Sequence, residues 1–164
     1  MIWIYKYQSP LGAVTMAARG NALIGLWFDG QKYFGATLTE DCEEKQLPVF
    51  HEAERWLNTY FKGVLPDFMP PIETGGTNFQ REVWDILKTI PYGKTMTYGQ
   101  IGAEIAKRRG LSSMSAQAVG SAVGRNPISI LVPCHRVVGA DGSLTGYAGG
   151  MEKKRALLTL EKAM

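Results

Sequence analysis

Three prolines followed by a pair of glycines interrupt the middle of the chain and divide it into two parts. The segment 66–76 holds these residues, and such a composition favours a linker over a helix or a strand. We therefore predict a first domain over residues 1–75 and a second domain over residues 76–164. A chain of 164 residues has room for two small domains with hydrophobic cores, but not for several ordinary ones.

The first part has the pattern of β-strands. Apolar runs over residues 2–7, 13–18 and 22–28 are separated by short segments that contain Gly, Pro or Asn, which predicts a small antiparallel meander. Further along, Pro48 is a typical first residue of a helix, and Gly63 closes that helix. We expect a small domain made of a sheet and one helix.

The second part has the pattern of helices. Thr77 with Gln80, and Thr97 with Gln100, have the spacing of capping boxes at the starts of two helices. A further helix is predicted over residues 115–125, after a short polar loop. The expected fold class is thus α+β, with an antiparallel-sheet domain followed by a mostly helical one. The last two helices fit a helix-turn-helix unit, and an ordinary helical hairpin is the alternative.

The two parts carry opposite net charges. Residues 1–75 hold six Lys or Arg against nine Asp or Glu, and residues 76–164 hold twelve against six, so their balances are −3 and +6. A basic part attracts a phosphate backbone, and the alternative is an ordinary solvated surface, which is the commoner meaning of so modest an excess. The helix over residues 115–125 lacks the side chains that read base edges in a major groove. Its small residues allow close approach to a core helix or to a nucleic-acid groove.

A thiol lies beside an imidazole in the second part. The apolar run 128–132 is predicted as a buried strand that leads into Cys134 and His135. A thiolate is a nucleophile, and a nearby base can remove the thiol proton. Neighbouring side chains on a regular strand point to opposite faces, so the two groups can cooperate only if the backbone turns or a water connects them. The alternative is a small buried cysteine with no chemical role.

The cysteine and histidine content argues against a disulfide framework and against a zinc site. The chain has two cysteines and two histidines, without the paired spacings that hold zinc. Such low cysteine usage fits a reducing compartment. No apolar stretch reaches the length of a membrane helix, and the first residues do not form a signal peptide. We therefore expect a cytoplasmic protein that needs no metal.

Several segments of the second part together resemble one known family. The motif Pro133-Cys134-His135-Arg136 and the segment 146–150 resemble the O6-alkylguanine-DNA alkyltransferases, also called methylated-DNA–protein cysteine methyltransferases. The resemblance extends back through residues 79–84 and 91–98 and covers most of residues 77–163. The first part is similar only in general style, as the small sheet-plus-helix domain that precedes the DNA-binding domain in this family.

The resemblance implies a role for each of five residues in alkyl transfer. Cys134 would take the alkyl group from guanine O6 and keep it as a thioether. His135 would remove the thiol proton through a water, and Glu161 would hold the imidazole. Such a relay predicts a Cys134 thiol pKa below that of a free cysteine. Asn126 would tie the DNA-binding helix to this network, and Tyr98 would donate a hydrogen bond toward guanine N3.

The resemblance also implies how DNA is bound. Guanine O6 lies inside the duplex, so the nucleotide must be extruded into a pocket. The helix over residues 115–125 would enter the minor groove, and Gln117 stands where the family carries an arginine that fills the vacated stack. Val137 and the loop 147–149 would line the base pocket. The expected substrate and DNA contacts are Gln117, Ala116, Ala118, Gly120, Ser121, Arg125, Arg136, Val137, Tyr147, Ala148 and Gly149.

The function implied by the resemblance is direct reversal of O6-alkylguanine damage in double-stranded DNA, with O4-alkylthymine as a second substrate to test. The protein would act once per molecule, as a monomer and without a cofactor. A non-enzymatic lesion-binding protein of the alkyltransferase-like type is the main alternative, although such proteins lack the acceptor cysteine. A methylation-sensing activator would need a cysteine-rich zinc module, and a thiol hydrolase would turn over repeatedly and ignore DNA.

Overall fold

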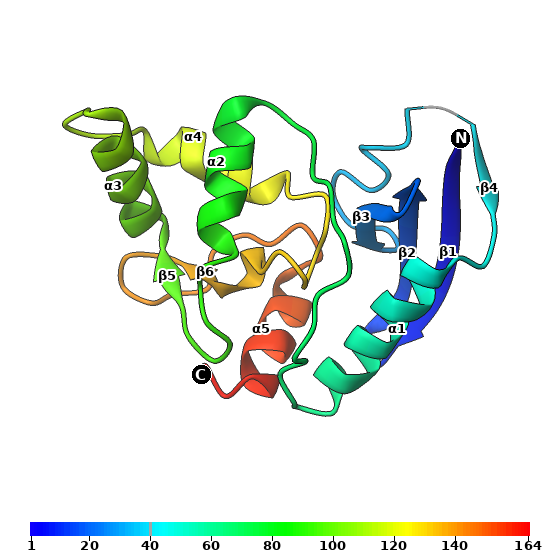
Figure 1. Ribbon diagram of the computed structural model, residues 1–164. Helices are drawn as coiled ribbons and strands as arrows, with labels where there is room; N and C mark the ends of the chain where they lie inside the picture. Colours follow the sequence, from blue (N-terminus) through cyan, green and yellow to red (C-terminus); the bar gives the residue numbers. More distant parts are fainter. Residues whose placement is uncertain (40) are drawn as a thin grey trace. The chain divides into compact units, whose positions relative to one another are not determined.

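The computed structural model describes residues 1–39 and 41–164. These residues form two compact units (Figure 1). The first unit contains residues 1–75 together with 127–129, and the second contains residues 76–126 and 130–164. Among the described residues, no helix has the length and apolar character needed to cross a membrane. The α+β fold class expected from the sequence is confirmed.

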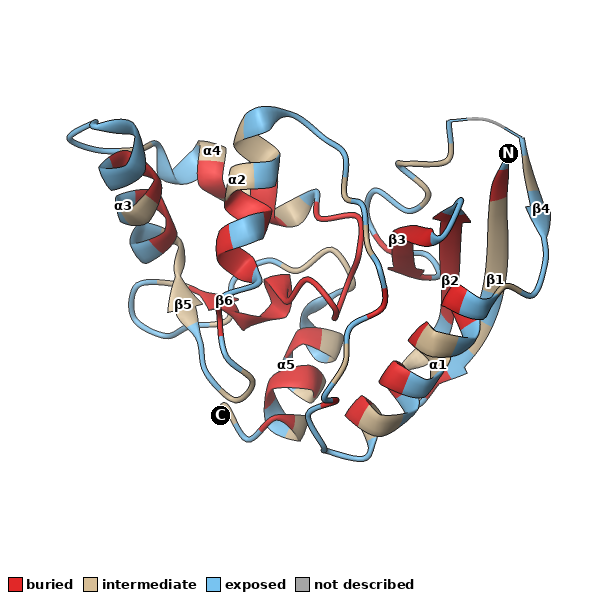
Figure 2. Cartoon of the chain, viewed as in Figure 1, coloured by how far each residue is buried: buried red, intermediate tan, exposed pale blue. Residues whose placement is uncertain are grey.

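The first unit is built on a four-stranded sheet with the order β3-β2-β1-β4. Strands β1, β2 and β3 form the predicted antiparallel meander, and the short β4 pairs in parallel with β1. The bounds are β1 (Ile2–Ser9), β2 (Gly12–Arg19), β3 (Ala22–Phe28) and β4 (Cys42–Glu44). Every residue of β3 is buried, and Figure 2 shows that burial also extends along most of β2.

Helix α1 (Pro48–Phe61) covers this sheet with one apolar face. Pro48 occupies its start, as expected, and Gly63 has a φ of +81° just beyond its end. Because glycine adopts this left-handed conformation without strain, it is suited to stop a helix. The buried residues of the helix are Val49, Phe50, Ala53, Trp56, Leu57 and Tyr60.

Residues 127–129 belong with the first unit, although the predicted boundary had assigned them to the second part of the chain. They lie beside β3: the Leu26 amide donates to the Pro127 carbonyl at 2.9 Å, and the Ser129 amide donates to the Leu26 carbonyl at 2.9 Å. The Ser129 hydroxyl also lies 3.3 Å from Oε1 of Gln31. The backbone thus adds a short parallel bridge at the edge of β3 that β2 does not occupy, where Leu23 also bridges Ile72. No local sequence pattern predicts this bridge.

The second unit consists of helices around two very short strands. Its elements are α2 (Asn78–Leu87), β5 (Met96–Thr97), α3 (Tyr98–Arg109), α4 (Ala116–Gly124), the 3-10 helix η1 (Cys134–Arg136), β6 (Val137–Val138) and α5 (Met151–Leu160). Both predicted capping boxes are present at the starts of α2 and α3. Strands β5 and β6 pair in parallel, and this pairing brings the start of α3 next to the end of η1.

Helices α2, α3 and α4 pack together into one helical layer. The indole Nε1 of Trp84 on α2 donates to the Ala122 carbonyl of α4 at 2.8 Å. Gly102 of α3 is close to α4 as well, since a Cβ on this glycine would lie 3.7 Å from Val119. Gly110 ends α3 in a left-handed conformation, and residues 110–115 then connect α3 to α4 in the arrangement of a helix-turn-helix.

Candidate active site

Cys134 lies on a buried turn and not at the end of a strand. The strand predicted over residues 128–132 is absent: the backbone forms turns there, and Ile128 makes only an isolated bridge. Ile130 has a φ of +70°, a conformation that a β-branched residue rarely adopts and that carries strain. Cys134 then starts η1. Because η1 turns the backbone, the thiol and the imidazole of His135 are not forced onto opposite faces, as they would be on a strand.

His135 and Glu161 are hydrogen bonded in the interior of the second unit. Nε2 of His135 is 2.7 Å from Oε2 of Glu161, and neither side chain is exposed to solvent. Glu161 directly follows α5, and it also accepts a hydrogen bond from the Gly93 amide at 3.1 Å. The structure therefore brings together the two residues that the resemblance paired across 26 positions of the sequence.

Arg136 completes this buried cluster. Its Nε donates to Oε1 of Glu161 at 2.8 Å, its Nη2 donates to Oε2 at 3.1 Å, and its Nη1 donates to the Ile90 carbonyl at 2.7 Å. Arg136 was expected among the DNA contacts, but it is only 7% exposed and its guanidinium is occupied by these acceptors. We correct that expectation: the side chain lies inside the fold and neutralises the Glu161 carboxylate.

The cluster keeps the His135 imidazole neutral near pH 7. Burial lowers the pKa of His135, and this effect outweighs the hydrogen bond and the charge of Glu161, which raise it. The nearby positive charges of Arg136 and Lys154 lower the pKa of His135 further. A neutral imidazole can accept a proton, so His135 has the protonation state that a base requires.

The thiol of Cys134 does not have the depressed pKa that the sequence reasoning predicted. Burial raises the pKa of Cys134, because a buried thiolate loses its hydration. Two neighbours act in the opposite direction: a side-chain hydrogen bond from Asn126 and the positive charge of Lys154 both lower the pKa of Cys134. Burial is the largest of these effects, so the thiol stays protonated until a base acts on it.

Asn126 connects the end of α4 to the acceptor segment. The residue is buried, its Nδ2 donates to the Val132 carbonyl at 2.7 Å, and its side chain reaches the Cys134 thiol. The Cys134 amide donates to the same Val132 carbonyl at 2.8 Å. One carbonyl thus binds both the Asn126 side chain and the Cys134 backbone, which fixes their spacing.

Six of the residues expected to contact DNA lie on α4 or directly after it. Ala116, Gln117, Ser121 and Arg125 are exposed, and Ala118 and Gly120 are half-buried. Gln117, Ser121 and Arg125 lie four residues apart, so they share one side of the helix axis. Tyr98 at the start of α3 is close to this surface: a Cβ on Gly120 would lie 4.0 Å from Cε1 of Tyr98.

Two sequence families match the chain and together cover nearly all of it. The family described as 6-O-methylguanine DNA methyltransferase, ribonuclease-like domain, matches residues 2–74, and the family described as 6-O-methylguanine DNA methyltransferase, DNA binding domain, matches residues 78–163. The chain belongs to the 6-O-methylguanine DNA methyltransferase family. The resemblance seen in the sequence is thereby confirmed.

Curated relatives and solved structures of this family are similar over almost the full chain. The methylated-DNA–protein-cysteine methyltransferase of Mycobacterium tuberculosis is 44% identical over 99% of this chain and 94% of the relative. That of Methanosarcina acetivorans is 42% identical over 94% and 95% of the two chains. The crystal structure of M. tuberculosis OGT in complex with DNA has a TM-score of 0.84 at 43% identity, with coverage of 98% and 93%.

A more distant member of the 6-O-methylguanine DNA methyltransferase family has the same fold. The crystal structure of the O6-methylguanine-DNA methyltransferase from Pyrococcus kodakaraensis is 27% identical to this chain, with a TM-score of 0.65 and coverage of 98% and 99%. The α+β architecture is therefore retained while most residues differ.

The sequence did not point to Lys154 as a residue near the site. It lies on α5 and is completely buried. Its Nζ donates to the Val137 carbonyl and to the Gly146 carbonyl, the latter at 3.1 Å. Val137 itself is buried in β6, and Tyr147, Ala148 and Gly149 form a half-buried loop directly after Gly146. The signal in the sequence was the spacing of Lys154 with Leu157 and Leu158, which places it on the apolar face of α5.

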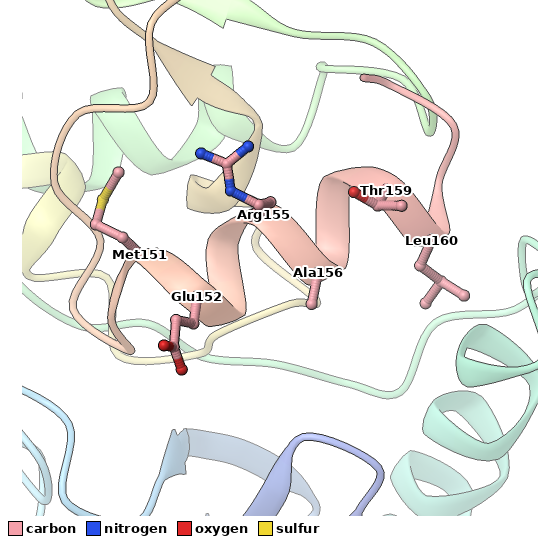
Figure 3. A pocket seen from close by; sticks show the side chains of 6 residues that line it. All are labelled: Met151, Glu152, Arg155, Ala156, Thr159 and Leu160. Carbon is pink, nitrogen blue, oxygen red and sulfur yellow. The ribbon is translucent and has the colours of Figure 1, made fainter.

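A surface pocket of about 620 Å³ lies on the other side of α5 (Figure 3). It is lined by Met151, Glu152, Arg155, Ala156, Thr159 and Leu160. Lys154, Leu157 and Glu161 occupy the opposite, buried face of the same helical segment, so this pocket is separate from the acceptor site. Among the described residues, no group of His, Cys, Asp and Glu is arranged to hold a metal ion.

Proposed function

We propose that this chain repairs alkylated DNA by transferring the alkyl group from guanine O6 to Sγ of Cys134. The observation that carries the proposal is the placement of a buried thiol on the turn that also carries His135, itself held by Glu161, in a member of this family. The group remains on sulfur as a thioether, so each molecule acts once and needs no cofactor. O4-alkylthymine presents a similar alkyl ether and is a second substrate to test.

The transfer begins when His135 takes the Cys134 proton, through a bridging water if the nitrogen does not reach the thiol directly. Glu161 fixes the imidazole and stabilises the positive charge that it gains. The sulfur–carbon bond forms as the carbon–O6 bond breaks, and the electron pair leaves with the guanine. Tyr98 donates toward guanine N3 and offsets the charge that develops on the base.

Access to the lesion requires a nucleotide turned out of the duplex, because O6 lies within the base pair. The exposed face of α4 supports this step, because its small residues permit a close approach to the minor groove. Gln117, which is exposed on this face, then enters the vacated stack. The partner is therefore double-stranded DNA that contains O6-alkylguanine. We propose that the protein acts on it as a monomer, in a cytoplasm whose reducing conditions keep Cys134 as a thiol.

The test is intact-mass spectrometry after incubation with an oligonucleotide that contains O6-methylguanine. We expect one added methyl group per molecule, on the peptide that contains Cys134. The variant Cys134→Ala should gain no methyl group while still binding the lesion DNA, and the matched variant Cys42→Ala should gain it as the parent does. Repeated turnover, or transfer that persists in Cys134→Ala, would overturn the proposal and favour a different thiol chemistry.

A further inference from the structure

The chain passes through the first unit for a short stretch just before it reaches the acceptor. Residues 127–129 belong to the first unit, whereas Asn126 and the residues from Ile130 onward belong to the second. In the second unit, Nδ2 of Asn126 donates to the Val132 carbonyl at 2.7 Å and so closes the base of this excursion. The Cys134 amide donates to the same carbonyl at 2.8 Å. The acceptor therefore lies directly beyond a loop that is closed at its base.

Ile130 indicates that this loop is held at both ends. Its φ of +70° is unfavourable for a β-branched residue, and its side chain is buried. A strained residue keeps such a conformation only where its surroundings fix the chain on either side. The bond from Asn126 to Val132 is one anchor. The pairing of residues 127–129 with β3 is the other, so this pairing is part of what fixes the chain before Cys134.

The side chain of Gln31 completes the anchor on β3. Leu26 binds Pro127 and Ser129 through its own amide and carbonyl, both at 2.9 Å. Further along the strand, the Phe28 amide donates to Oε1 of Gln31 at 2.9 Å, and the Ser129 hydroxyl donates to the same oxygen at 3.3 Å. Both polar side chains are buried, where polar groups are kept only when they are hydrogen bonded. One carboxamide oxygen thus joins the end of β3 to the last anchored residue.

We propose that Gln31 is a positioning residue for the alkyl acceptor: its carboxamide holds Ser129 at the edge of β3 and thereby fixes the chain that leads to Cys134. This inference rests on the proposed transfer to Cys134 and deepens it, because it gives a residue of the first unit a part in the reaction. Gln31 touches no substrate and moves no proton in this scheme. It acts only through the short stretch of chain between Ser129 and Cys134.

Loss of the Ser129 bond should make Cys134 easier to reach. The thiol is only 6% exposed, so a bulky thiol reagent labels it when the chain around it opens. A hydrogen bond of 3.3 Å between neutral side chains is weak, and its removal shifts an opening equilibrium about threefold. We therefore expect Ser129→Ala to react about three times faster with dithiobis(nitrobenzoate) in native buffer. All chains carry Cys42→Ala, which leaves Cys134 as the only thiol.

Two further chains test whether Gln31 and Ser129 act together. Gln31→Met removes the carboxamide at nearly equal side-chain length. It also removes the acceptor of the Phe28 amide, so labelling of Cys134 should become about tenfold faster. Adding Ser129→Ala to Gln31→Met should change the rate no further, because the bond between the two side chains is already lost.

Transfer from the free base O6-benzylguanine gives a second readout that needs no DNA. In Ser129→Ala and Gln31→Met, the rate at saturating base should fall in the order in which labelling rises. The half-saturating concentration should stay that of the parent, because the change displaces the thiol and not the base. The matched control is Thr37→Val, which removes a hydrogen bond of 3.0 Å to the Ile24 carbonyl of the same strand. Its labelling and transfer rates should both equal those of the parent.

Labelling of Ser129→Ala at the parent rate would overturn the proposal, whether or not Gln31→Met folds. Equal acceleration in Thr37→Val would overturn it as well, since the effect would then come from general loosening of the first unit. Faster labelling without slower transfer would have the same consequence. The labelling needs no alkyl donor. A parent protein that shows the expected labelling pattern but takes up no methyl group would therefore contradict the proposed function and leave the hold of Gln31 on Cys134 standing.

Discussion

Arg136 and Glu161 form a two-point ion pair inside the second unit, with Nε of Arg136 2.8 Å from Oε1 and Nη2 3.1 Å from Oε2 of Glu161. The same carboxylate binds Nε2 of His135 at 2.7 Å. One buried carboxylate is thus hydrogen bonded both to the permanently charged Arg136 guanidinium and to the titratable His135 imidazole. The Arg136 cation offsets the charge of this carboxylate, and an ionised Glu161 can stabilise the imidazolium that forms when His135 accepts a proton.

We predict that Glu161→Gln slows alkyl transfer strongly at neutral pH and destabilises the fold by about 3–5 kcal/mol, because the Arg136 guanidinium is left buried without its partner. Single-turnover rates from pH 6 to 9 and urea unfolding measure the two effects. The control is Glu82→Gln, since Glu82 pairs with Arg109 at 2.7 Å near the surface and should cost less than about 1 kcal/mol. If the two variants behave alike, Glu161 has no special role.

The depressed pKa of His135 predicts a loss of stability in mild acid. The pKa of His135 lies below the ordinary value of 6.5 in the folded protein. Between pH 6.5 and the folded-state pKa, the unfolded chain therefore binds more protons than the folded protein does. The free energy of unfolding therefore keeps its full value above pH 6.5 and decreases as the pH falls below 6.5 toward the folded-state pKa of His135. Urea unfolding at pH 7.5 and 5.0 should show the loss in the parent.

The matched comparison for this pH effect uses the other histidine. His51 lies on α1 in an exposed position, so His51→Gln should keep the difference between pH 7.5 and 5.0, whereas His135→Gln should reduce it. Equal pH dependence in all three chains would mean that His135 is not the titrating group.

Because Gln117 replaces the arginine that the family usually carries, we predict slower repair of duplex substrates but not of the free base. An arginine that enters the stack makes charge-assisted hydrogen bonds worth about 1.5–3 kcal/mol, where a glutamine contributes about 1. Gln117→Arg should therefore speed repair of O6-methylguanine in a duplex roughly fivefold and hardly change transfer from free O6-benzylguanine. Comparing both rates in parent and variant decides the point. Equal acceleration on the two substrates would place the effect of residue 117 in the pocket or the fold.

Binding to undamaged DNA should be weak, independent of sequence and steeply dependent on salt. The +6 balance of residues 76–164 and the lack of base-reading side chains on α4 both favour phosphate contacts, each of which contributes about −0.9 to the slope of log K against log salt. Arg125→Gln on the α4 face should reduce the slope by about one, and Lys62→Gln at the end of α1 should not. A strong preference for one undamaged sequence would contradict this.

The local features of the fold were predictable from the sequence, whereas the role of the motif around Cys134 stays a prediction. Thr97 and Gln100 mark the start of α3 because a capping box depends only on residues three positions apart. The pairing of His135 with Glu161 came from the family resemblance and not from spacing. It could not have come from local pattern, because it joins η1 to the end of α5.

The features that the sequence missed depend on long-range packing. Ile130 adopts a positive φ, which no rule for a β-branched residue predicts, so an apolar run was interpreted as a strand. The raised pKa of Cys134 results from its burial, which a dipeptide motif does not reveal. The resemblance placed Arg136 among the DNA contacts, whereas here Glu161 and the Ile90 carbonyl hold its side chain inside the fold.

Residues 127–129 pair with the edge of β3, so a cut at the linker after Gly75 would not separate the two units cleanly. A fragment that begins at Gly76 would keep Cys134 together with the His135, Arg136 and Glu161 cluster. It would lack the Leu26 amide and carbonyl that bind Pro127 and Ser129. Asn126 and Ile130, which flank this short segment, would then be anchored on one side only. Removing residues 1–75 would therefore also remove the hydrogen-bond partners of Pro127 and Ser129, which lie only a few residues before Cys134 in the chain.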